Sequence, residues 1–232
     1  MVEVIDGFMD AATCEALVEL ARPRLAKSKV WDIATGSEKE DDYRVSEQMF
    51  FGRSDHLTSA LIALEMSVRE APPGASPEVK AYDSPPGVKA EVERFRRERD
   101  LIRSIEEAIE STTGIRLNHG EGIQVLHYNP GGYYKPHYDY FDPQFDGNKA
   151  VLGRGGQRKA TFMVYLNDVE EGGGTSFPQQ NFLAVPKTGR ALFWKNVKED
   201  GSLDPDTLHA AEPVIKGEKW IFTKWLREKE FV

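Results

Sequence analysis

The chain has 232 residues and is acidic: 30 Lys and Arg against 38 Asp and Glu leave a formal net charge of −8 and a pI near 5.3. An acidic chain is not expected to have nucleic acid or an anionic membrane as its main partner. No apolar run approaches the roughly 18 residues that a bilayer span needs. The 40% hydrophobic content supports a proper core, and we expect a single domain over residues 1–232.

The single cysteine and the start of the chain bear on location. Cys14 alone excludes an internal disulfide framework and a cysteine-rich zinc site, and it fits a reducing compartment. The opening residues MVEVIDGFMD contain no basic stretch followed by an apolar run, so they do not resemble a secretory signal. We therefore expect a cytoplasmic protein.

The first elements in chain order are a short strand, a helix and a second strand. Residues 2–8 (VEVIDGF) have strand character. Asp10 is placed to cap a helix whose apolar residues fall at helical spacing until Pro23 limits it. Residues 44–51 (RVSEQMFF) predict the second strand.

Two more helices are predicted in the first half of the chain. An amphipathic helix follows Ser54, and another runs from about Asp100 to Thr113. The stretch between them is rich first in proline and then in charge, which indicates an exposed excursion with some helix. Residues 1–117 are therefore expected to form a helical support region with an insertion near 69–98.

The composition changes after Gly114 to short segments rich in β-branched and aromatic residues, separated by Gly and Pro turns. These segments are EGIQVLHY, KATFMVYLNDV, GTSFPQQNFLAVP, GRALFWKN and KWIFTKWLRE. Several short strands after a run of helices predict a mostly β fold, a sandwich or barrel over residues 118–232 with helices packed on one side.

A metal site is predicted in the stretch YYKPHYDYF. His137 and Asp139 stand two residues apart, so on a strand an imidazole and a carboxylate point to one place. His209, at a turn leading into the last strands, can supply a third ligand. Two histidines and one carboxylate leave three positions open on an octahedral metal, the arrangement of non-haem Fe(II) oxygenases. Catalytic zinc is a weaker alternative, because no clear water-activating glutamate lies nearby in the sequence.

Lys219 makes the pattern more specific. It lies ten residues after His209, so on a nearby strand its ammonium can face the same cavity. A cation beside apolar strand residues needs an anionic partner. A dicarboxylate co-substrate that chelates the iron at one end supplies that anion at its other end.

These residues lie in motifs that resemble the prolyl 4-hydroxylase family of Fe(II)- and 2-oxoglutarate-dependent dioxygenases. The matching stretches are HYNPGGYYKPHYDYF, TFMVYLNDVEEGGGTSFP, VPKTGRALFWKN and LHAAEPVIKGEKWIFTKWLRE, together with CEALVELARPRLAKSKV and YRVSEQMFF near the start. The resemblance covers most of the chain. It implies a double-stranded β-helix, or jelly roll, with N-terminal helices packed on one sheet.

The resemblance also implies roles for individual residues. The iron ligands are His137, Asp139 and His209. The residues at 2-oxoglutarate are Lys219, which pairs with its distal carboxylate, and Tyr128, Tyr165 and Thr223. The residues near the substrate groove are Tyr134, Arg158 and Trp225. Two departures bear on the substrate: the insertion near 69–98, and Arg227, which stands where some members carry histidine.

The implied activity is hydroxylation of prolyl residues in a peptide or protein, with Fe(II), 2-oxoglutarate and O2, release of succinate and CO2, and ascorbate as a supporting reductant. One alternative is the same chemistry on a free amino acid or small metabolite, with the segment 69–98 as a lid. Another is a jelly-roll binding module without catalysis. The complete ligand set with Lys219 argues against the binding module, because a pure binder does not need all four residues.

Overall fold

The structure is a computed structural model that describes the chain except residue 33, residues 69–85 and residue 232. Its helices are α1 (Ala11–Ala21), α2 (Ser54–Ser67), α4 (Pro86–Thr113) and α5 (Lys149–Gly153). No helix in this part of the chain is both long and apolar enough to cross a membrane.

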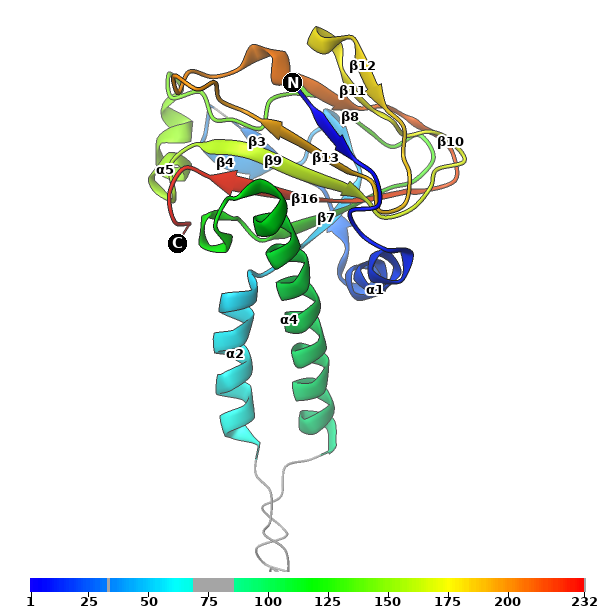
Figure 1. The fold of residues 1–232 in the computed structure, drawn as a ribbon, viewed down its shortest axis with the longest axis vertical. Helices are drawn as coiled ribbons and strands as arrows, with labels where there is room; N and C mark the ends of the chain where they lie inside the picture. Colours follow the sequence, from blue (N-terminus) through cyan, green and yellow to red (C-terminus); the bar gives the residue numbers. More distant parts are fainter. Residues whose placement is uncertain (33, 69–85, 232) are drawn as a thin grey trace, which may run out of the picture.

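Two antiparallel sheets form the body of the molecule (Figure 1). The larger sheet has the strand order β1 (Glu3–Ile5), β13 (Ala191–Lys195), β9 (Arg158–Tyr165), β16 (Lys219–Arg227), β7 (Ile123–Tyr128), β6 (Glu47–Phe51) and β2 (Ala26–Lys27). The smaller sheet has the order β12 (Phe182–Ala184), β11 (Thr175–Phe177), β14 (His209–Ala211), β8 (Tyr133–His137) and β5 (Arg44–Val45). This arrangement confirms the expected jelly roll, and strands from before residue 118 extend both sheets.

Two two-stranded sheets complete the strands. They are β3 (Val30–Asp32) with β4 (Ser37–Lys39), and β10 (Glu171–Gly172) with β15 (Val214–Lys216).

The larger sheet is apolar on both faces because each face covers a different partner. On β9, Phe162 and Val164 belong to the core cluster that includes the helix residue Ile105. The alternate residues Met163 and Tyr165 belong to the cluster between the two sheets. Period-2 alternation therefore separates a helix-facing core from an inter-sheet core, and the site is built on the inter-sheet side.

Helix α1 begins where the sequence predicts. The Asp10 carboxylate accepts the Thr13 N–H at 2.7 Å, which satisfies one of the free donors of the first turn. Cys14 and Leu17 on its inner face are fully buried against the helix-facing core. The cap and the apolar stripe together explain why this short helix forms and which face it presents.

Helix α4 corrects the predicted start of the third helix, because it begins at Pro86 and not near residue 100. The charged stretch is helical because its charges fall at helical spacing: Arg96 Nη1 lies 2.7 Å from Glu93, and Arg103 Nε lies 2.8 Å from Glu107. Arg96 also reaches Glu65 of α2 at 2.6 Å. Strong local charge therefore marks a solvated helix face here, not an irregular segment.

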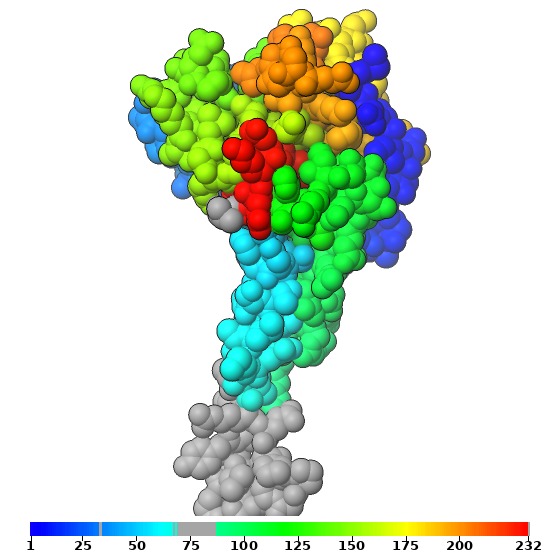
Figure 2. All heavy atoms as spheres, turned by 60° about the vertical axis from the view of Figure 1, so that its left-hand side comes forward, coloured from blue at the N-terminus to red at the C-terminus, as the bar shows by residue number. Residues whose placement is uncertain are grey.

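The α2/α4 hairpin projects from the sheets (Figures 1 and 2). Of the predicted insertion 69–98, residues 69–85 lie outside the described residues. Residues 86–98 form the half of α4 that is farther from the sheets (Figure 1).

A buried ion pair joins this hairpin to the larger sheet. Lys224 Nζ of β16 donates to Glu106 of α4 at 2.6 Å and to the Glu121 carbonyl at 2.7 Å. The other oxygen of Glu106 accepts the Ser54 N–H at 3.1 Å at the start of α2. Both side chains are nearly solvent-free, so each charge is compensated inside the protein.

Candidate metal centre and co-substrate pocket

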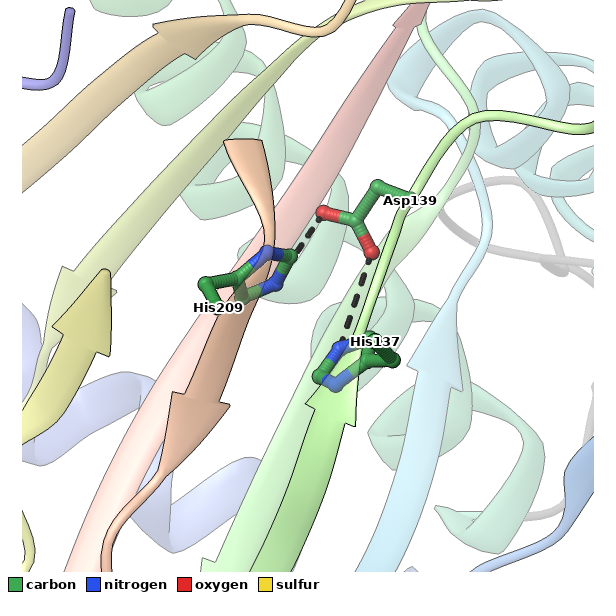
Figure 3. A group of neighbouring side chains, drawn as sticks. All are labelled: His137, Asp139 and His209. Carbon is green, nitrogen blue, oxygen red and sulfur yellow. Dashed lines mark ion pairs between the residues drawn. The ribbon is translucent and has the colours of Figure 1, made fainter. Parts of the chain in front are cut away.

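The structure brings the three predicted metal ligands together at adjacent strands of the smaller sheet. His137 ends β8, Asp139 follows it, and His209 begins β14 directly opposite His137. The carboxylate oxygens of Asp139 lie 3.9 Å from Nε2 of His137 and 3.6 Å from Nε2 of His209 (Figure 3). All three ligand atoms lie within 4.8 Å of one another, close enough to bind one ion.

Hydrogen bonds to the backbone orient both imidazoles. Nδ1 of His137 donates to the Lys135 carbonyl at 2.8 Å, and Nδ1 of His209 donates to the Thr207 carbonyl at 2.9 Å. Because a carbonyl can only accept, each Nδ1 donates a proton to the backbone and each Nε2 is the nitrogen left to face the ion. The donor set therefore consists of two imidazoles and one carboxylate.

Asp139 is oriented by residues that the sequence interpretation missed. The Thr161 hydroxyl donates to Asp139 Oδ2 at 2.7 Å, and the Asn196 amide donates to Thr161 at 2.9 Å. All three side chains are buried. The signal that could have found Thr161 is a polar residue within the apolar strand KATFMVY, on the face that alternation assigns to the inter-sheet side.

Burial and neighbouring charges set the protonation of the ligands. Burial, assisted by the charge of His209, lowers the pKa of His137 to about 3. Burial alone would raise the pKa of Asp139, but the two imidazoles and Arg158 outweigh it and lower that pKa below the ordinary value. At neutral pH the site therefore holds a carboxylate and an uncharged His137 ready to bind a metal.

A cavity of about 870 Å³ opens on the triad. Five other predicted site residues line it together with the metal ligands: Tyr128, Tyr134, Arg158, Thr223 and Trp225. Two predicted residues, Lys219 and Tyr165, are not among the described lining residues. Both are fully buried and contact the wall from within: Lys219 Nζ lies 5.2 Å from the Tyr128 ring centre, and the Tyr165 hydroxyl lies 2.7 Å from Thr175 Oγ1.

Lys219 is a fully buried cation without a carboxylate at ion-pair distance among the described residues. Within the described part of the chain, its Nζ donates one long hydrogen bond, to the Gly174 carbonyl at 3.4 Å. Burial lowers its pKa to about 7, against a weak opposing effect of Glu212. A ligand carboxylate beside Nζ would supply the missing charge, as the sequence predicted.

Aromatic and basic residues form the part of the cavity expected to face the substrate. Tyr134 stacks on His137 with ring centres 3.6 Å apart, and the Arg158 guanidinium lies 3.6 Å from the Trp225 ring centre. Nε and Nη2 of Arg158 bind Glu121 at 2.6 and 3.0 Å, so a carboxylate that was not predicted fixes this arginine. Because Nε and Nη2 bind Glu121, Nη1 is the nitrogen of Arg158 that could make the predicted contact with the substrate.

Arg227 shares the same carboxylate. Its Nε lies 2.7 Å from Glu121, and its side chain is almost fully buried. Burial alone would raise the pKa of Glu121, but Arg158 and Arg227 lower it, so the carboxylate stays charged between them. The arginine at the position where some family members have histidine is thus part of a paired, buried cluster.

A jelly roll with a buried His, Asp and His at one point defines the class of non-haem iron oxygenases. The family model of the 2OG-Fe(II) oxygenase superfamily matches residues 123–227. The chain is 35% identical to "Probable prolyl 4-hydroxylase 3" of Arabidopsis thaliana, over 98% of this chain and 69% of that protein. It is 34% identical to Prolyl 4-hydroxylase 5 of the same plant, over 98% of this chain and 68% of that protein.

A solved structure agrees with these relatives. The 2OG complex of the viral collagen prolyl hydroxylase from Paramecium Bursaria Chlorella virus-1 matches with a TM-score of 0.55 and 26% identity, over 97% of this chain and 95% of that chain. The chain belongs to the prolyl 4-hydroxylases, 2-oxoglutarate-dependent dioxygenases of the 2OG-Fe(II) oxygenase superfamily. Its Fe(II), 2-oxoglutarate and O2 requirements follow from that membership, and the donor set and the uncompensated Lys219 fit the metal and the dicarboxylate.

Proposed function

We propose that the protein hydroxylates prolyl residues within a peptide or protein and releases succinate and CO2. The observation that carries the proposal is that one cavity is lined both by the metal ligands and by Tyr134, Arg158 and Trp225. A cavity of about 870 Å³ is far larger than one free amino acid needs and suits an extended peptide segment. No observation favours the free amino acid or the binding module.

The residues of the chain act by binding and orienting. His137, Asp139 and His209 hold the iron, and the Lys219 ammonium pairs with the distal carboxylate of 2-oxoglutarate through a charge-assisted bond. When bound, Fe(II) and 2-oxoglutarate supply the activation of O2 that the side chains cannot perform. The rings of Tyr128, Tyr134 and Trp194 exclude water from the reacting region.

Trp225 and Tyr134 are the rings assigned to the peptide, and Nη1 of Arg158 is the donor assigned to a peptide carbonyl. A proline-rich segment in the polyproline II conformation exposes its carbonyls and loses little entropy when it binds. Glu121 holds the Arg158 guanidinium against the Trp225 ring, so ring and donor are presented together. This pre-arrangement supports a peptide with alternating prolyl rings and free carbonyls.

Two further expectations belong to the proposal. Ascorbate is expected to restore iron that oxidises without productive turnover. A reducing, cytoplasmic location is supported by the single cysteine, Cys14, which is free and fully buried. Omission of ascorbate from the assay should shorten the time over which turnover continues.

Mass spectrometry of peptides tests the substrate. A panel of proline-rich peptides is incubated with enzyme, Fe(II), 2-oxoglutarate and ascorbate, and the expected result is a gain of one oxygen atom that maps to proline. Arg158→Ala should lower peptide turnover while 2-oxoglutarate decarboxylation without peptide stays unchanged. No oxidised proline across the panel, with oxidation of a free amino acid, would contradict the proposal.

A further inference from the structure

Arg44 is a second buried cation in the wall of the cavity. It belongs to β5, where it pairs with Tyr134 of β8, and only 7% of its surface is exposed. Its guanidinium binds neutral oxygens: Nε donates to Ser46 Oγ at 3.2 Å, Nη1 donates to the Lys29 carbonyl at 3.4 Å, and the side chain also hydrogen-bonds to the Tyr128 hydroxyl. None of these partners carries a charge that compensates the cation.

The other buried cations of the described residues show how unusual this is. Arg53 is paired with Asp55, Lys224 with Glu106, and Arg227 with Glu121. Only Arg44 and Lys219 lack a carboxylate at ion-pair distance within the part of the chain that the structure describes. An uncompensated charge removed from water is strongly unfavourable. Since Lys219 fits a ligand carboxylate, the same reasoning applies to Arg44.

Arg44 neighbours two rings of the pocket, one that contacts a metal ligand and one that contacts Lys219. Its guanidinium lies 4.8 Å from the ring centre of Tyr134, the ring that stacks on His137. Tyr128 is the second ring: burial raises the pKa of that phenol, and the charge of Arg44 and its hydrogen bond to the hydroxyl oppose the rise. Tyr128 in turn faces Lys219. Arg44 is therefore one ring away from His137 and one ring away from Lys219.

From this geometry we propose that Arg44 forms a second carboxylate-binding subsite, distinct from that of Lys219. A guanidinium presents a rigid fork that matches a carboxylate with two parallel hydrogen bonds. Two sources share this chemistry: the carboxylate of 2-oxoglutarate on the metal side, and an acidic side chain of the peptide beside the reacting proline. The second source rests on the proposed function, and the first does not.

The first experiment asks whether Arg44 serves the fold or a ligand. Arg44→Gln removes the charge, and the matched control Arg190→Gln removes an arginine that pairs with Asp6 at the surface. Thermal melting of the ligand-free proteins is measured. Because an uncompensated buried charge is removed, Arg44→Gln is expected to melt at or above the wild-type temperature. A melting temperature several degrees below that of the control overturns the proposal.

The second experiment identifies the carboxylate. Anaerobic calorimetry of the Fe(II) protein measures 2-oxoglutarate affinity, and turnover is compared for two peptides that differ only in Glu or Gln beside the proline. If 2-oxoglutarate supplies the carboxylate, Arg44→Gln loses at least ten-fold in its affinity. If the peptide supplies it, the wild type prefers the Glu peptide at least five-fold and Arg44→Gln abolishes the preference.

The variant Arg44→Lys keeps the positive charge but lacks the forked guanidinium. It should therefore partly restore the 2-oxoglutarate affinity or the Glu preference that Arg44→Gln loses. Unchanged 2-oxoglutarate affinity together with no Glu preference in the wild type overturns the proposal. If the wild type hydroxylates no peptide at all, the proposed function fails, and the calorimetric comparison still decides whether Arg44 binds a carboxylate.

Discussion

Two lysines of the same strand, β16, show how this fold treats buried charge. Lys219 and Lys224 have 0% and 1% of their surface exposed. Lys224 faces the helices and binds Glu106 at 2.6 Å, whereas Lys219 faces the smaller sheet and reaches only a carbonyl at 3.4 Å. The charge of Lys224 is neutralised within the protein, whereas Lys219 needs a ligand to supply its counter-charge. The difference teaches that the outer face of the sheet was built for stability and the inner face for binding.

The largest expected effect concerns the inner face. Each of His137→Ala, Asp139→Ala and His209→Ala removes a metal ligand and should abolish turnover, because two donors cannot keep the metal in place. Folding should largely survive, since both cores lie outside the triad. Succinate formation and bound iron are measured for each variant, with circular dichroism as the check on folding. Succinate formation at the wild-type rate in any variant contradicts the assignment.

On the outer face, removal of one partner of the Lys224–Glu106 ion pair should lower the free energy of unfolding. Glu106→Gln leaves Lys224 buried without a counter-charge, and a broken buried pair typically costs about 3–5 kcal/mol of unfolding free energy. Urea unfolding measures the loss. The double variant Glu106→Leu with Lys224→Met should recover much of it, because both charges are then absent. If the single and double variants lost the same unfolding free energy, the unpaired charge of Lys224 would not be the cause of the loss.

The corresponding change at Lys219 should act on binding and spare the fold. Lys219→Ala removes a charge-assisted bond to a buried carboxylate, worth roughly 1.5–3 kcal/mol, or about ten- to a hundred-fold in 2-oxoglutarate affinity. Iron binding should remain nearly intact. Lys219→Arg should also bind poorly, because the guanidinium is larger and forked. Calorimetry that finds normal 2-oxoglutarate binding in Lys219→Ala would place the co-substrate elsewhere.

The smallest effect is a pH dependence of stability that comes from Lys219. Burial lowers the pKa of Lys219 to about 7 in the folded, ligand-free protein, below its ordinary value of 10.5. Between these values the unfolded chain binds the extra proton, so stability should rise with pH from about 7 towards 10.5, by at most about 1.4 kcal/mol per pH unit.

The contribution of Lys219 is obtained as the difference between the unfolding free energies of the wild type and Lys219→Met, measured across that pH range without ligand. All other groups cancel in this difference. We expect Lys219→Met to have the larger unfolding free energy near pH 7, and the difference from the wild type should become smaller as the pH rises. A difference that stays constant with pH would mean that Lys219 keeps its ordinary pKa and is solvated or paired in solution.

Much of the fold could be predicted from local patterns. The Asp10 cap, the strand alternation after Gly114, and the pair His137 and Asp139 two residues apart are all properties of short stretches, which have the same geometry in any fold. The long helix α4 was predicted too short because dense charge masked its helical spacing. The Glu93–Arg96 pair follows from spacing within α4, whereas the contact of Arg96 with Glu65 became visible only once the helix was placed beside α2.

The sequence by itself determined the chemistry of the metal centre: its donor types, their spacing on the strand, and the lysine ten residues after the third ligand. Tertiary structure alone decided what surrounds them. Tyr134 and His137 should face opposite sides of a regular strand. A register shift against β14 brings their rings together at 3.6 Å. Thr161 of β9, Arg44 of β5 and Glu121, just before β7, come to the site from distant parts of the chain. Alternation can assign Thr161 to the inter-sheet face, but the partners that these three residues meet depend on long-range contacts that the sequence pattern does not encode.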